Sequence, residues 1–165
     1  MPDLISHAAS LYVVKNCFVK SRVFSRSFFA MAMLGVFLPD IISRGVMKLF
    51  PAATMIAQYF HTPAACFFQA LFISCLFVRE QRYLVFWAIT AGWVLHQVFD
   101  VFQHHLGPGL YFMLWPLYWE PIKIPLIQST EWPLVAASTM TLAWVTGAVL
   151  ARQKKIVVQN DAVKK

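Results

Sequence analysis

The chain has 165 residues, of which 59% are hydrophobic and only 13% are charged. Soluble domains are about 45–50% apolar and about 25% charged, so this composition predicts an integral membrane protein and excludes a disordered chain or a large soluble enzyme. The net charge of +7 comes without a basic motif that carries interleaved aromatics, so we attribute it to membrane topology and predict no nucleic-acid partner.

Five apolar stretches are candidates for membrane-spanning helices, because a bilayer core needs about 20 helical residues. The first is weakened by Lys15 and the second is short, whereas the last runs for twenty residues without a charge. In chain order they are Leu4–Val19, Ser27–Leu38, Pro63–Val78, Tyr83–Phe102 and Trp132–Ala151. We therefore predict an all-α integral membrane bundle of about four to five transmembrane helices, occupying residues 1–152.

Three other stretches do not have the pattern of a simple span. Residues 41–60 contain two basic residues and a proline, which favours an interfacial helix or a loop. Residues 107–125 are rich in aromatics and broken by prolines, which favours an interfacial or re-entrant segment. Residues 153–165 are polar, and we expect a mobile cytoplasmic tail.

The basic residues predict the orientation, because cytoplasmic loops of membrane proteins carry an excess of Lys and Arg. Threading five spans with the basic clusters inside places the N-terminus outside and the C-terminus in the cytoplasm. Only Arg44, Lys48 and Lys123 then lie outside. The eleven basic residues inside are Lys15, Lys20, Arg22, Arg26, Arg79, Arg82, Arg152, Lys154, Lys155, Lys164 and Lys165.

The scarce histidines and aspartates gather on one side of this topology, which was threaded without using them. Ionisable groups near the hydrocarbon are costly, and they persist when they are paired, face a cavity or bind a metal. Asp40 and Asp100 both fall at the outer ends of apolar spans. The histidines on the same outer side are His7, His61, His96, His104 and His105. The outer face is therefore the candidate functional site.

The pair His96 and Asp100 is the most specific local signal. A spacing of four residues places both side chains on one helix face, one turn apart. An imidazole and a carboxylate in this arrangement can ligate one divalent metal, or the carboxylate can orient the imidazole. The alternative is a hydrogen bond that merely satisfies two polar groups. His104 continues the same stripe if the helix persists.

The other candidates have plain structural interpretations when each is taken alone. Asp40 follows Leu38-Pro39, where it is well suited to cap the next helix. His61 is typical of an interfacial histidine whose ring reaches water, and His7 is near the terminus, where histidines are usually solvated. His105 is expected to be a polar interfacial residue.

Together these motifs resemble the bacterial membrane-bound metal-dependent hydrolase family, which consists of small inner-membrane proteins. The order and rough spacing agree over about residues 1–120. The matching segments are Ser6-His7, Gly35 to Asp40 with its Leu38-Pro39-Asp40, His61-Thr62, His96 to Asp100, Gly107 and Leu114-Trp115-Pro116.

The resemblance implies a metal-dependent hydrolase at the outer-leaflet interface of the inner membrane, with a lipid-like ester or phosphoester as substrate. The implied ligands are His7, Asp40, His61, His96 and Asp100. Such a mixed nitrogen and oxygen set suits Zn²⁺, with Mn²⁺ or Fe²⁺ as alternatives. The metal would activate a water molecule, and Asp40 or Asp100 would take the proton.

Several positions depart from the family pattern, and they support a second hypothesis. Ile42 replaces a second Asp, Ile56 and Ala57 replace a His and an Arg, and Phe102 replaces a polar residue. The alternative function is therefore a non-catalytic membrane subunit or scaffold of a larger complex. Its partner proteins would bind the aromatic stretch at residues 111–119.

Overall fold

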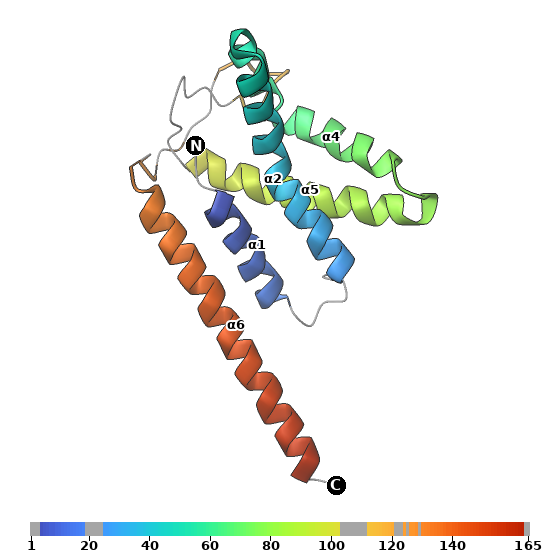
Figure 1. Cartoon of the computed structure of the whole chain (residues 1–165), viewed down its shortest axis with the longest axis vertical. Helices are drawn as coiled ribbons and strands as arrows, with labels where there is room; N and C mark the ends of the chain where they lie inside the picture. Colours follow the sequence, from blue (N-terminus) through green and yellow to red (C-terminus); the bar gives the residue numbers. More distant parts are fainter. Residues whose placement is uncertain are drawn as a thin grey trace.

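The computed structural model describes residues 4–18, 25–102, 112–120, 124, 126–128 and 130–163. These residues form helices and turns without a β-strand, so the prediction of an all-α bundle is confirmed (Figure 1). A short 3₁₀ turn at Pro51–Ala53 precedes α3. The helices are α1 (Leu4–Cys17), α2 (Arg26–Leu49), α3 (Thr54–Tyr59), α4 (Pro63–Cys75), α5 (Arg79–Phe102) and α6 (Trp132–Val163).

Within the described ranges, three helices are long and apolar enough to cross a membrane, namely α2, α5 and the segment Trp132–Gln153 of α6. The apolar α4 has only 13 residues and α1 has 14. At 1.5 Å per residue both are shorter than a hydrocarbon core of about 30 Å. The described part of the bundle therefore combines three full-length candidate spans with the shorter helices α1, α3 and α4.

Helix α2 continues past the point where we expected it to end. It runs through Pro39 to Leu49, although a proline inside a helix removes one backbone hydrogen bond. Pro39 and Asp40 are both buried there, so tertiary packing outweighs the local helix-breaking tendency. The prediction that Asp40 caps the start of a new helix was therefore wrong, and residues 41–49 of the predicted interfacial segment 41–60 continue α2.

Two glycines allow α2 and α5 to cross with their backbones in contact. A methyl group on Gly35 would overlap the backbone of Ile89, and one on Gly92 would overlap the backbone of Ala32. Small residues permit this close approach between helices in membranes. Asp40 lies five residues beyond Gly35, and His96 lies four residues beyond Gly92. The crossing therefore determines where these two side chains meet.

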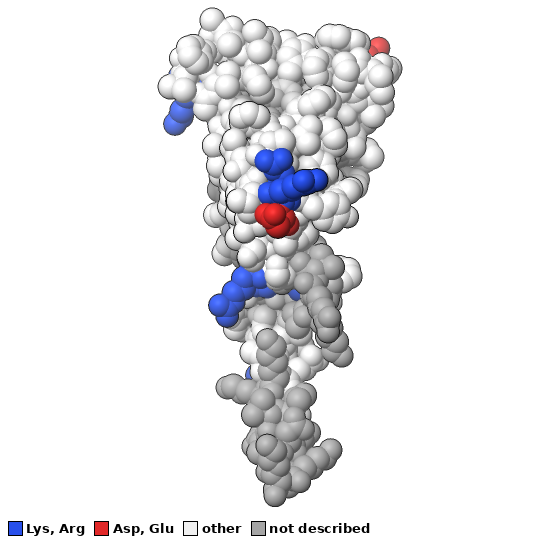
Figure 2. Space-filling view, turned by 90° about the vertical axis from the view of Figure 1, so that its right-hand side faces the viewer, with Lys and Arg blue, Asp and Glu red and all other residues white. Residues whose placement is uncertain are grey.

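The remaining helices pack around this crossing. Helix α4 lies along α5, and α1 lies beside α6 (Figure 1). Asn16 Nδ2 in α1 donates a 3.0 Å hydrogen bond to Thr146 Oγ1 in α6. Only 6% of the candidate span in α6 is buried. Charged side chains are few on the face shown in Figure 2, as the composition predicts for a membrane protein.

The structure also bears on the predictions for the C-terminal residues and for the aromatic segment 107–125. Helix α6 continues without interruption from the apolar span to Val163, so the expected mobile tail is helical over residues 153–163. In the segment 107–125 the structure describes residues 112–120 and 124. Residues 112–120 contain a turn at 113–117 and no helix, and the ring centroid of Trp115 lies 5.3 Å from that of Tyr59.

Candidate metal centre

Five buried side chains from four parts of the chain converge in the bundle. His7 comes from α1, Asp40 from α2 and His61 from the turn before α4, while His96 and Asp100 come from α5. Their exposed fractions run from 0% to 8%. The expectations that His7 is solvated and that the ring of His61 reaches water were therefore wrong.

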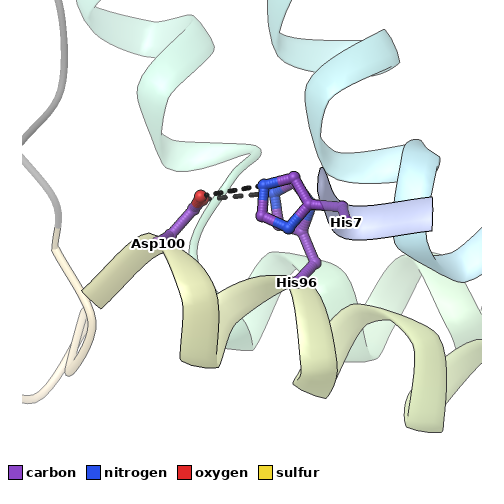
Figure 3. A group of neighbouring side chains, drawn as sticks. All are labelled: His7, His96 and Asp100. Carbon is purple, nitrogen blue, oxygen red and sulfur yellow. Dashed lines mark ion pairs between the residues drawn. The ribbon is translucent and has the colours of Figure 1, made fainter. Parts of the chain in front are cut away.

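Three imidazole rings surround the carboxylate of Asp100. His61 Nε2 lies 2.5 Å and His96 Nε2 lies 3.1 Å from Asp100 Oδ2, and His7 Nε2 lies 3.5 Å from Asp100 Oδ1. Figure 3 shows His7 and His96 reaching Asp100 from two different helices. The two rings stack with their centroids 4.2 Å apart. The nitrogen atoms of three histidines thus face one carboxylate.

Several polar atoms of this cluster have no hydrogen-bond partner among the described residues. They are both ring nitrogens of His7, Nδ1 of His96 and Oδ1 of Asp100. A buried polar group without a partner costs about 1–3 kcal/mol. Moreover, His61 Nε2 and His96 Nε2 lie only 3.0 Å apart. Nitrogen and carboxylate donors this close together, with unsatisfied atoms among them, fit a divalent cation.

Asp40 adds a second carboxylate on the other side of His61. Its Oδ1 lies 3.9 Å from Nδ1 of His61, while Nε2 of the same ring faces Asp100. Asp40, His61 and His96 form one group that could hold a metal ion, and His7, His96 and Asp100 form another. His96 belongs to both groups. The two groups therefore constitute a single site.

Charge and hydrogen bonding favour the protonated form of His61 when no cation is bound. Burial opposes the charged ring, but the hydrogen bond to Asp100 and the charges of Asp100 and Asp40 outweigh it. The pKa of His61 is therefore raised above its ordinary value of 6.5. A metal ion that binds this ring must displace a proton that is held more tightly than usual.

The backbone around His61 is held by neighbouring side chains. Gln97 Nε2 donates a 2.8 Å hydrogen bond to the His61 carbonyl, and Gln69 Nε2 donates a 2.9 Å bond to the carbonyl of Phe60. Thr62 caps α4 by accepting from the amide of Ala65 at 3.3 Å. Gln97 was missed by the sequence analysis, although a glutamine beside His96 in an apolar span was a visible signal.

Some residues singled out in the sequence do not contribute to the described site. His104, His105 and Gly107 lie outside the described residues. At the positions that depart from the family pattern, Ala57 is fully buried and Ile56 is 60% exposed. The histidine and aspartate groups of the site come from other positions.

No protein-family model matches this chain, and neither a curated protein nor a solved structure matches it significantly. The fold and the site therefore define its class. It is an all-helical protein whose described residues include three helices long and apolar enough to cross a membrane and a buried His/Asp cluster that could hold a metal ion.

Proposed function

We propose that this protein is a metal-dependent hydrolase of the bacterial inner membrane that acts on a lipid-like ester or phosphoester. The observation that carries the proposal is the convergence of three imidazoles and two carboxylates, from four parts of the chain, at one buried point. Ionisable groups are expensive in an apolar bundle, so their concentration at one place favours function over packing.

Three histidines and one aspartate are the best ligand set. His7, His61 and His96 present nitrogen atoms toward Asp100, which makes four donors of the types that Zn²⁺ prefers, with Mn²⁺ or Fe²⁺ as alternatives. A bound metal would supply Lewis-acid activation of the scissile group and of water.

Asp40 is the best candidate for the general base. Among the described residues, three imidazole rings lie within 3.5 Å of the Asp100 carboxylate, whereas the imidazole closest to Asp40 is that of His61, at 3.9 Å. A carboxylate in this position can accept a proton from a reacting water molecule. Arg44 Nη2, 3.3 Å from Asp40 Oδ2, would hold the carboxylate in place.

The proposed orientation has the site at the outer face and the C-terminus in the cytoplasm. The distribution of basic residues along the chain supports this orientation. His7 lies near the start of α1, His61 before α4 and Asp100 near the end of α5, as alternating helix directions would require for groups at one face. Asp40 lies in the second half of α2.

Metal analysis of the purified protein tests the proposal. We expect about one zinc ion per chain in the wild type and a loss of at least about tenfold in the double variant His96→Ala/Asp100→Ala. Ser74→Ala, at a buried polar position in α4 outside the cluster, serves as the control and retains metal. Equal and negligible metal in all three proteins would overturn the proposal. Hydrolysis of phosphoester and carboxylic ester lipids by the zinc-loaded protein then identifies the reaction.

A non-catalytic membrane subunit remains the second candidate, supported by the exposure of α6. Trp144 is 74% exposed and Leu134 is 69% exposed on this helix, which contacts the rest of the bundle mainly through α1. This hypothesis predicts co-purification with partner chains and unchanged function in the His96 and Asp100 variants. A lone, metal-loaded and active protein would contradict it.

A further inference from the structure

An apolar groove lies between α1, α2 and α6. Its volume is about 650 Å³, within the range of about 300–1,000 Å³ that is typical of ligand pockets. Leu4 and Ile5 of α1, Phe37 and Ile41 of α2, and Met140 and Ala143 of α6 are among the residues that line it. None of the described residues that line it is charged.

The groove adjoins the candidate metal centre through two helices. Leu4 precedes His7 by three residues in α1, and Phe37 precedes Asp40 by three residues in α2. Residues three apart in a helix are neighbours on its surface. The same turns of α1 and α2 that supply site residues therefore also supply the nearby wall of the groove.

The chemistry of the surroundings indicates what fills this groove. Helix α2 and the lining part of α6 belong to segments apolar enough to cross a membrane. In the hydrocarbon region the available filling material is an acyl chain, because water is excluded. A chain bound in the groove would have its polar end near the cluster of histidines and aspartates.

Arg44 places a positive charge beside the candidate metal centre. Its Nη2 lies 3.3 Å from Asp40 Oδ2, and its side chain remains 40% exposed. Its Nε is buried and makes no hydrogen bond within the described part of the chain. A guanidinium group binds the oxygens of a phosphate with two parallel hydrogen bonds. A neutral ester carries no negative charge to pair with the guanidinium.

We propose that the substrate is a phosphate-bearing lipid whose acyl chain occupies the groove and whose phosphate is bound by Arg44. The reaction assignment rests on the proposed hydrolase function. In hydrolysis the water oxygen bonds to phosphorus, the bond from phosphorus to the lipid alcohol oxygen breaks, and that oxygen takes up a proton. The residues of this chain recognise the lipid whether or not the reaction takes place, so a measurement of lipid binding tests this proposal.

The test compares two lipids that differ only in the phosphate. Monooleoylglycerol phosphate and monooleoylglycerol are titrated into the zinc-loaded protein in detergent, and native mass spectrometry gives the dissociation constant of each complex. We expect the phosphate-bearing lipid to bind at least about tenfold more tightly to the wild type. Equal affinities for the two lipids would overturn the assignment of a phosphate.

Arg44→Gln is expected to weaken binding of the phosphate-bearing lipid about tenfold and to leave binding of the uncharged lipid within about twofold. Lys48→Gln is the matched control, because this exposed cation lies one further turn along α2. An equal effect of both substitutions would indicate general electrostatic attraction and would overturn the role of Arg44.

Ala143→Phe fills the groove and is expected to weaken binding of both lipids about tenfold. Ala137→Phe places the same side chain at an exposed position of the same helix and is expected to change neither affinity. Met140→Trp fills the groove from a second position, in case the first variant does not fold. Unchanged lipid binding in a folded, zinc-binding groove variant would overturn the groove assignment.

Zinc content is measured in every variant, which separates this inference from the proposed function. A wild-type protein that binds zinc but shows no preference for the phosphate-bearing lipid contradicts the substrate assignment alone. A wild-type protein that binds the lipid as expected but no metal contradicts the hydrolase and retains the lipid site.

Discussion

Gly92 of α5 lies directly against the backbone carbonyl of Ala32 in α2, with no room for a methyl group between them. Four residues further along α5, His96 enters the candidate metal centre. On α2, Asp40 lies two turns beyond Ala32. The site therefore depends on a close helix crossing that contains none of the ligands.

The first prediction concerns this crossing. Gly92→Ala is expected to destabilise the protein by about 1–3 kcal/mol, because the new methyl group overlaps backbone and not a movable side chain. Gly45→Ala in α2 is the control, since nothing lies within 4 Å of the added group, and it should stabilise the helix by about 0.5–1 kcal/mol. Thermal unfolding in detergent measures both, and equal effects would contradict the backbone contact.

A second prediction separates the roles of the two aspartates. Asp100→Asn is expected to lose the metal, because this carboxylate lies among the three imidazoles. Asp40→Asn should retain metal and lose hydrolytic activity by about 10²–10⁴-fold, as expected for removal of a general base. Metal content and the rate of lipid hydrolysis are measured on the same preparations. Loss of metal from the Asp40 variant would make this residue a ligand instead.

The third prediction concerns Gln97, which holds the backbone of His61. Gln97→Leu removes the 2.8 Å hydrogen bond to the His61 carbonyl and should lower zinc affinity about tenfold, the lower end of the range for residues that support ligands. Gln69→Leu is the matched control, because it loses a similar bond to the neighbouring Phe60 carbonyl. Competition with a chelator measures both affinities. A loss of equal size in the control would indicate a general effect on the turn.

The fourth prediction is a pH dependence of metal binding. The pKa of His61 is raised above its ordinary value of 6.5. Without a metal, the ring therefore stays protonated up to a higher pH than a free histidine. Zinc binds the deprotonated ring, so its affinity should fall as the pH decreases through that raised pKa and should level off above it. Zinc titrations between about pH 5.5 and 8.5 test this sign. An affinity that stays constant over this range would exclude His61 as a ligand.

The main features of the fold could be predicted from local sequence patterns. Long apolar stretches indicate membrane-spanning helices wherever they are placed in the chain, and the spans at Tyr83–Phe102 and Trp132–Ala151 lie within α5 and α6. The continuation of α2 through Pro39 could not be predicted, because a proline alone favours a helix end. Burial of Pro39 and Asp40 in the bundle reverses that preference.

Within the site, the i, i+4 spacing of His96 and Asp100 is a local property, and both side chains are found together as the helix geometry requires. His7 and His61 have no such local signature. Their positions 93 and 39 residues before Asp100 carry no information about distance until the helices are packed together.

The sequence by itself determined the class of protein and the residues with metal-binding chemistry, because hydrophobicity and donor type belong to each residue wherever it lies. Only the tertiary structure decided that His7, His61 and Asp40 leave water and converge on α5, and that an apolar groove adjoins them. The physical reason is that convergence depends on the angle and closeness with which helices cross. Those depend on contacts between distant parts of the chain, such as the one between Gly92 and Ala32.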